Sequence, residues 1–388
     1  MDNQYMYKLT IIIPTKNRQF YCIESMKQII DATNESVQII IQDNSDDEKP
    51  LKDFCDRLSL ERVLYHYNNR VLSFVDNFSE AVEFSLGEYV CMIGDDDGVL
   101  PRIMDIVEIA QKEDIDCFIP GLNSVYFWPS DPPIVKGAIN GYEYISYLDD
   151  TIRVVNPQKS LKALLKRGFQ DYQKLDVPRL YHGLVHKRVL NLIKNKAGKY
   201  FDGLTPDMFM AVALCFVCNK VLAQNVPVTI SGICPKSGSS ASASGAHTGS
   251  LSDAPHFIGH NNYEWDKRIP YVYSVETIWA ETGLKSFDIF NSDKLSISFD
   301  SMYFLSRLWA KYPQFHNEIA LSAKEQKISV YKICLYSYYI RIYQLFKKVI
   351  KRIMRKKKDV IRFYEIFDMV SAAEKADNYI INFTERVL

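Results

Sequence analysis

The sequence has little of what marks an exported or membrane-spanning protein. Its first residues lack the basic stretch followed by an apolar run that typifies a secretory signal. No stretch reaches the ~18 uninterrupted apolar residues that a transmembrane helix needs. The 8 cysteines of the 388 residues are scattered, mostly within apolar runs, as is typical of reduced core residues. We therefore expect a cytoplasmic protein.

The low content of glycine and proline and the lack of repeats narrow the class of protein further. With only 16 Gly and 15 Pro and an apolar fraction of 47%, the chain is neither disordered nor collagenous, and it contains no internal repeat. The close pair Cys215 and Cys218 lies in an apolar helical run without a second pair, which favours core packing over a zinc or redox role. The length predicts two or three domains, at roughly 100–200 residues each.

Net charge is also absent, because 47 Lys and Arg balance 47 Asp and Glu. The balance is uneven along the chain: residues 329–366 contain eleven basic and two acidic residues. The remainder is correspondingly acidic. A neutral total therefore combines an acidic region with a basic one, and the two predict different partners.

Short apolar runs alternate with amphipathic stretches over the first 120 residues. The predicted strands are 9–13, 37–42, 62–67, 88–94 and 116–120, and the predicted helices are 20–32, 51–60, 73–86 and 102–112. Two of the strands are continuously apolar, as expected when helices cover both faces of a parallel sheet. The pattern predicts a doubly wound α/β domain that binds ligands at the carboxyl ends of its strands.

The rest of the chain is less regular. Helices are predicted around 157–166, 186–194 and 207–222, and residues 234–249 are rich in small residues, which predicts a mobile loop or linker. From about Pro255 onward the pattern is helical and aromatic.

Three consecutive carboxylates, Asp95, Asp96 and Asp97, directly follow a predicted buried strand. Such a cluster repels itself unless a cation or strong donors compensate. A hard divalent metal with oxygen ligands fits this position, and metal-bound diphosphate is the natural further partner. The alternative is a solvated acidic turn before the helix that follows Pro101.

Four motifs in this order resemble the family 2 inverting glycosyltransferases of the GT-A fold. They are Thr10-Ile-Ile-Ile-Pro-Thr-Lys-Asn-Arg18, Gln42-Asp-Asn-Ser-Asp46, the segment from Asn77 to Val90, and Asp95-Asp-Asp97. The resemblance is close over residues 8–120 and looser to about 240. It implies a GT-A fold, a Rossmann-like mostly parallel sheet for nucleotide-diphospho-sugar transfer, followed by a helical region.

The resemblance also implies residue roles on the donor side. Pro14, Thr15, Asn17, Arg18, Asp43, Asn44 and Asn77 are expected to bind the nucleotide. A carboxylate suits ribose hydroxyls or a uracil N–H, and an arginine suits phosphate. Many family members have Asp where this chain has Gly94, so the metal-binding pair must come from the triplet. We expect Asp97 as direct ligand of Mn²⁺ or Mg²⁺, Asp95 as its partner, and Asp96 on the ribose or on the metal through water.

On the acceptor side, inversion requires a general base for the acceptor hydroxyl. Asp207 fits the family's position for this acid, with Asp202 as the alternative; capping of the helix that starts here is the structural reading. His182 is a candidate acceptor contact, although a structural role is the more common one. In the loop at 234–249, Lys236, Ser237 and His247 are expected to cover the pyrophosphate, unless this segment is an interdomain linker.

The basic region is a helix with an aromatic face. Residues 331–353 place aromatic and aliphatic side chains at helical spacing, and residues 347–358 contain eight cations. This pattern predicts an interfacial anchor on anionic lipid. A helix packed on the catalytic domain and an oligomerisation helix are the alternatives, whereas no nucleic-acid-binding motif accompanies the charge.

Together these features predict two regions. Residues 1–250 form the catalytic domain, with a nucleotide-binding half (1–120) and an acceptor half with the donor loop (121–250), and residues 251–388 form the helical region. The expected activity is hexosyl or N-acetylhexosaminyl transfer, with inversion, from a UDP-sugar to a surface polysaccharide or lipid-linked glycan at the inner face of the cell membrane. A sugar-nucleotide nucleotidyltransferase and a non-catalytic glycan- or membrane-binding protein remain alternatives, whereas the absence of G-x-G-x-x-G argues against a dehydrogenase.

Overall fold

The computed structural model describes residues 5–131, 141–238, 240, 248–251, 254–260, 263–291, 297–353 and 360–385. Within these residues, a large sheet has the strand order β3–β2–β1–β4–β10–β6–β11–β9. The strands are β1 (Tyr7–Thr15), β2 (Val37–Asp43), β3 (Val63–Tyr67), β4 (Gly87–Met92), β6 (Cys117–Ile119), β9 (Asp149–Val155), β10 (Leu184–His186) and β11 (Val221–Asn225). Only β10 and β9 run antiparallel to their neighbours in this described sheet. The predicted α/β class with a mostly parallel sheet is confirmed.

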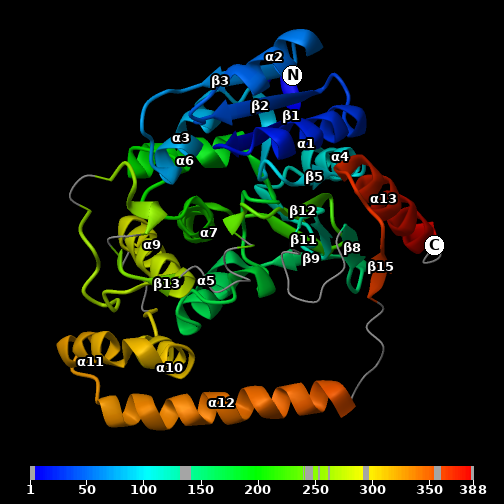
Figure 1. Ribbon diagram of the computed structural model, residues 1–388. Helices are drawn as coiled ribbons and strands as arrows, with labels where there is room; N and C mark the ends of the chain where they lie inside the picture. Colours follow the sequence, from blue (N-terminus) through cyan, green and yellow to red (C-terminus); the bar gives the residue numbers. More distant parts are fainter. Residues whose placement is uncertain are drawn as a thin grey trace.

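Helices cover both faces of the large sheet (Figure 1). They are α1 (Gln19–Ala32), α2 (Lys49–Leu58), α3 (Phe74–Glu83), α4 (Ile103–Lys112), α5 (Pro157–Lys166), α6 (Lys187–Ala197) and α7 (Pro206–Val217). Ile11 and Ile13 pack in the core cluster of α1, α2 and α4, whereas Ile12 packs in that of α3, α6 and α7. Because successive strand residues point to opposite faces, this explains why β1 is continuously apolar.

The predicted helix at 207–222 is wrong at its end. The helix stops at Val217, and residues Val221–Asn225 form β11. This strand pairs with β6 on one side and with β9 on the other. Long-range pairing therefore overrides the local helical pattern.

A second sheet brings the end of the chain back to its beginning. Its described strands have the order β15–β8–β7–β12–β5: β5 (Gly98–Val99), β7 (Ser124–Phe127), β8 (Tyr142–Ile145), β12 (Thr229–Ile233) and β15 (Ile361–Phe363). The last helix, α13 (Met369–Glu385), packs on α1 and β5. Figure 1 shows α13 and β15 beside α4, β5 and β8. The division at residue 250 stays a prediction; the final strand and helix pack on elements from residues 1–250.

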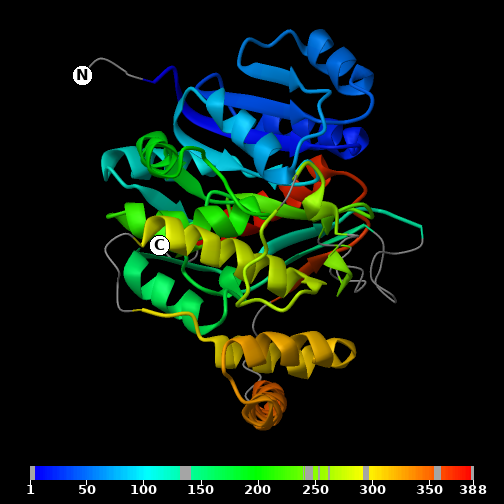
Figure 2. The ribbon, with the colours of Figure 1, turned by 90° about the vertical axis from the view of Figure 1, so that its left-hand side faces the viewer.

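The helical region comprises β14 (Tyr273–Ser274), which pairs with β13 (Thr248–Gly249), α9 (Val275–Phe290), α10 (Ser301–Lys311), α11 (His316–Glu325) and α12 (Val330–Ile353). In this region, α9 lies beside α7, and α10, α11 and α12 lie below the sheets in the view of Figure 1. α9 packs on α7, and α12 packs on α10 along the outer edge, where Figure 2 shows it end-on. Over the described residues, none of the helices combines the length and apolar character needed to cross a bilayer.

Candidate active site

The acidic triplet lies in the turn between β4 and β5 and is buried. Little space is left for a side chain at position 94, because a Cβ there would lie 2.8 Å from the Tyr181 hydroxyl and 3.0 Å from Asp97 Oδ2. β12 approaches more closely still: a Cβ on Gly232 would lie 1.6 Å from the backbone oxygen of Asp96. The glycine that departs from the family pattern therefore makes room for the contacts of Asp97.

Arg18 and Thr15, from the end of β1, compensate Asp95. Arg18 Nη2 lies 2.6 Å from Asp95 Oδ1, and the Thr15 hydroxyl donates to Oδ2 at 2.6 Å. Burial nevertheless outweighs Arg18 and raises the pKa of Asp95 above its ordinary value. Arg18 Nη1 also faces Asp96 Oδ1, at 3.5 Å. Arg18 is thus placed as the counter-ion of Asp95 and Asp96.

Asp97 is surrounded by donors. Its Oδ1 accepts from the Gly232 amide at 2.7 Å, and its Oδ2 lies 2.6 Å from the Gly94 amide, 3.0 Å from the Tyr181 hydroxyl and 3.2 Å from His182 Nε2. Burial pushes the pKa of Asp97 upward, but the interactions with His182 and the two amides hold it below its ordinary value. His182 also bonds to the Thr229 hydroxyl at 2.8 Å, which fixes its ring.

These contacts bear on the predicted metal site. Both oxygens of Asp95 and of Asp97, the two expected ligands, already face protein donors. Asp96 Oδ2 accepts from the Cys234 amide at 3.0 Å, which leaves Oδ1 beside Arg18. In the part of the chain that the structure describes, no group of three or more His, Cys, Asp or Glu is arranged to hold a metal ion. As placed, the triplet does not fit an ion while Arg18 stays on it.

The other predicted nucleotide residues build the turns around the strand ends. Asp43 is fully buried, accepts from the Ser45 amide and the Tyr65 hydroxyl at 2.9 Å each, and has a pKa raised by burial. The Asn44 amide donates to the backbone oxygens of residues 68 and 70, and Asn17, with φ of 57°, bonds to residues 45 and 46. Pro14 lies inside β1, opposite Gln42, and Asn77 is buried on α3. Their nucleotide-binding roles stay predictions.

Asp207 occupies the first turn of α7. Its Oδ2 accepts from the Tyr172 hydroxyl at 3.0 Å, and its Oδ1 accepts from the Met208 amide at 2.9 Å. Burial outweighs these bonds and raises the pKa of Asp207. The alternative, Asp202, lies 3.0 Å from Lys199 and 3.2 Å from Lys285; although burial opposes it, these cations and the Gly203 amide lower its pKa.

A cavity of about 940 Å³ joins the triplet to Asp207. Its volume lies at the upper end of the roughly 300–1,000 Å³ typical of small-molecule sites. The predicted site residues among its lining are Arg18, Asp96, Asp97, His182, Asp207 and Ser237. Asp95, Asp202, Asp43 and Lys236 are not among them, and His247 lies outside the described residues.

Several lining residues were missed by the sequence analysis. Tyr181 forms a bridge with Met92 at the end of β4 and precedes β10. Tyr172 lies in a 3-10 turn (Tyr172–Lys174), and Glu276, Trp279 and Tyr312 come from the helical region. The position of Tyr181 beside His182 was the one local signal available. The other residues reach the cavity only through the packing of distant segments.

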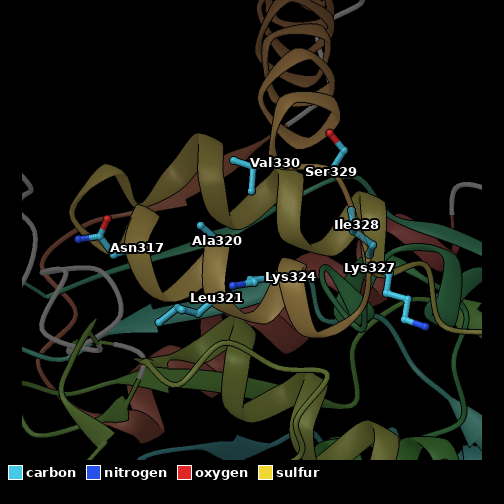
Figure 3. Close-up of a pocket in the computed structure, with 8 residues that line it drawn as sticks. All are labelled: Asn317, Ala320, Leu321, Lys324, Lys327, Ile328, Ser329 and Val330. Atoms are coloured by element: carbon cyan, nitrogen blue, oxygen red, sulfur yellow. The ribbon is translucent and has the colours of Figure 1, made fainter.

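Another hollow, of about 770 Å³, lies on α11 and its connection to α12 (Figure 3). Its lining residues are Asn317, Ala320, Leu321, Lys324, Lys327, Ile328, Ser329 and Val330. None of them is a carboxylate, a histidine or an aromatic residue. This hollow therefore lacks the acid, base and aromatic side chains that line the larger cavity.

The fold and the cavity define an α/β protein with a cavity at the carboxyl ends of its parallel strands, where proteins of this architecture bind ligands. Residues 10–131 match the family model described as glycosyl transferase family 2. This match confirms, for that segment, the resemblance to family 2 glycosyltransferases and the GT-A fold class.

Comparison with curated protein sequences gives no significant match. Among solved structures, the chain is similar to S. aureus TarS, with 13% identity and a TM-score of 0.41 over 59% of this chain; it spans only 37% of that TarS chain. A structure of S. aureus TarS 1–349 in complex with UDP-GlcNAc has 11% identity and a TM-score of 0.46, over 80% of this chain and 72% of that one. A complex of the same fragment with UDP has 12% identity and a TM-score of 0.43, over 82% and 88%.

Proposed function

We propose that the protein transfers a sugar, with inversion, from a nucleotide-diphosphate donor to a hydroxyl of a glycan, with Asp207 as general base. The observation that carries the proposal is the single cavity that Asp96 and Asp97 line together with Asp207. A donor diphosphate held near the triplet and an acceptor near Asp207 can meet within it. We propose uracil as the base of the donor, because a carboxylate at a strand end, such as Asp43, suits a uracil N–H.

The chemical step follows from the position of Asp207. Its carboxylate takes the proton of the acceptor hydroxyl while the acceptor oxygen forms a bond to the anomeric carbon. The bond from that carbon to the diphosphate oxygen breaks, and its electron pair leaves with the nucleotide diphosphate. The raised pKa of Asp207 supports this role, because a base with a pKa closer to neutrality is the stronger proton acceptor.

Arg18 is the cation that pairs with the triplet, beside which the diphosphate is expected. It lines the cavity while paired with Asp95 and Asp96. The manganese or magnesium expected from the sequence stays part of the proposal. Asp95 and Asp96 would hold it only if Arg18 left their carboxylates, whereas both oxygens of Asp97 already face backbone amides. The freed guanidinium then suits the phosphate, as does Ser237 at the start of the predicted donor loop.

The acceptor is proposed to be a surface polysaccharide or a lipid-linked glycan, with a hexose or N-acetylhexosamine as the transferred sugar. The described part of α12 supports a membrane-bound acceptor. Apolar side chains that are about half exposed or more follow one another along it: Tyr331, Leu335, Tyr338, Tyr339, Ile342, Leu345, Phe346 and Val349. Because cations accompany this face, we assign it to the anionic inner surface of the cell membrane.

The test of the transferase is a donor screen by calorimetry with UDP, GDP, CDP and TDP, with and without manganese. We expect UDP to bind and manganese to tighten its binding. If no nucleotide binds, the proposed transferase function is wrong. If UDP binds equally well with and without manganese, only the proposed metal dependence is wrong. Flotation with vesicles that contain anionic lipid tests α12, and equal flotation after Tyr338, Ile342 and Phe346 are changed to serine contradicts the anchor.

A further inference from the structure

The far end of the cavity, beyond Asp207, is walled by the helical region. Val275, Glu276, Ile278 and Trp279 of α9 line it, and so do Lys311 and Tyr312 at the end of α10. The sequence predicts acceptor recognition in residues 121–250, which precede these helices. The lining therefore adds a part of the chain to which no binding role has been assigned.

The first turns of α9 are held rigidly in this position. Ser274 and Thr277 form a reciprocal capping box, in which each side chain accepts from the other residue's backbone amide. The helix also packs along α7, the helix that bears Asp207, where the Ser286 hydroxyl donates to the backbone oxygen of Phe209 at 2.9 Å. Trp279 is thus fixed relative to the candidate base.

A chain of contacts joins Trp279 to Asp207. The rings of Trp279 and Tyr172 meet edge to face, with centroids 5.0 Å apart and an interplanar angle of 85°. The hydroxyl of the same Tyr172 donates to Asp207 Oδ2 at 3.0 Å. An aromatic surface at Trp279 therefore lies one residue away from the group that must receive the acceptor proton.

The charges at this end cancel. Glu276 forms an ion pair with Lys311 and accepts a hydrogen bond from the Tyr312 hydroxyl at 2.7 Å. The remaining polar lining residues here include the amides Gln173 and Gln314. Aromatic rings with a few fixed amides and one neutralised carboxylate suit a ligand that has an apolar face and uncharged hydroxyls, which describes a neutral pyranose.

We propose that Trp279, with Gln173 and Glu276, forms a subsite for a neutral pyranose ring of the acceptor, and that this ring directs its hydroxyl to Asp207. The proposal rests on the transferase function for the direction of transfer, whereas the binding of the ring does not depend on it. The subsite makes the helical region part of acceptor recognition.

The experiment measures the binding of simple glycosides to the full chain by saturation-transfer NMR. The probes are the methyl β-pyranosides of glucose, galactose and N-acetylglucosamine, with methyl β-glucuronide as the anionic counterpart. Trp279→Ala should weaken binding of the neutral probes about tenfold, and Trp279→Phe by less, because it keeps a ring. Tyr271→Ala is the matched control, since Tyr271 is 71% exposed and does not line the cavity.

The outcomes separate the subsite from the transferase. Equal binding by wild type and Trp279→Ala, tighter binding of the glucuronide, or no binding of any neutral probe by the wild type overturns the subsite. Calorimetry with UDP on the same samples reports on the transferase independently. Loss of pyranoside binding in Trp279→Ala with unchanged UDP binding is the expected result; pyranoside binding through Trp279 without any nucleotide binding keeps the subsite and overturns the transferase.

Discussion

The carboxylates at the two ends of the cavity have opposite surroundings. Asp95, Asp96 and Asp97 face a guanidinium, a histidine, hydroxyls and backbone amides, so that their charge is compensated within the protein. Asp207 accepts from one phenol and one amide and has no cation partner among its described contacts. Asp97 alone in the triplet has a lowered pKa, whereas burial raises the pKa of Asp95, Asp96 and Asp207. What distinguishes Asp207 is that no cation pairs with it among its described contacts, which leaves its carboxylate available to accept a proton.

The largest expected effect follows from removing the uncompensated carboxylate. Asp207→Asn should lower turnover on the order of 10²–10⁴-fold, the usual contribution of a general base, with little change in UDP affinity. Asp202→Asn is the matched control, because Asp202 is ion-paired and does not line the cavity. Steady-state kinetics of the two variants decide between the candidates, and a larger loss in Asp202→Asn would reverse the assignment.

The next effect concerns the counter-ion of the triplet. Arg18→Met should lower the free energy of unfolding by about 3 kcal/mol, since it leaves Asp95 buried without its cation. Asp95 can then take up a proton, so the loss should be smaller at pH 6 than at pH 8. Denaturant unfolding measures both values.

A double variant sharpens this prediction. Adding Asp95→Asn to Arg18→Met removes the buried charge that has lost its partner and should restore part of the stability. Additive losses would show that Arg18 and Asp95 do not depend on each other. Asp53→Asn is a suitable control, because Asp53 pairs with Lys49 on the surface.

A smaller effect is expected from the phenol that contacts the base. Tyr172 donates to Asp207 and thereby lowers a pKa that burial raises. Tyr172→Phe removes this donor, so the pKa of Asp207 should rise and the acid limb of the pH–rate profile should move to higher pH. On the acid limb of the profile, turnover should fall on the order of tenfold, from the about 1.5 kcal/mol of a hydrogen bond to a charged group. An unmoved limb with a uniformly lower rate would assign Tyr172 a structural role.

The two ends of the cavity also differ in how far the sequence could predict them. The triplet, Thr15 and Arg18 follow apolar strands, and carboxyl ends of neighbouring parallel strands meet at one sheet edge, so their proximity was predictable. The donor that contacts each carboxylate oxygen could not be predicted. Gly232 lies on β12 and Cys234 directly follows it, and the pairing of β12 with β5 has no local signal in the sequence.

At the Asp207 end, local pattern carried less information. The position of Asp207 at a helix start was predictable, but its neighbours Tyr172 and Trp279 come from a 3-10 turn and from α9. Aromatic residues at helical spacing look alike whether they fill a core or line a cavity. The return of β15 and α13 to the first half of the chain was equally hidden, because strand partners are chosen by the whole fold.

The smallest expected effect is on stability, and its sign separates the two aspartates. A raised pKa means that Asp207 stabilises the fold at pH values below the pKa of an unfolded aspartate and that this contribution is lost as the pH rises through its folded pKa. At pH 8, Asp207→Asn should therefore raise the free energy of unfolding by on the order of 1 kcal/mol over the wild type, as measured by denaturant unfolding. At pH 4 the variant should be no more stable than the wild type.

Asp202 should behave in the opposite way. Its lowered pKa contributes stability above the pKa of an unfolded aspartate, and this stability is lost as the pH falls through its folded pKa. Asp202→Asn should accordingly weaken the protein at pH 8, where its pairs with Lys199 and Lys285 are formed. Opposite signs at pH 8 are the expected signature of a carboxylate kept for catalysis beside one used for structure, and equal signs would remove the distinction.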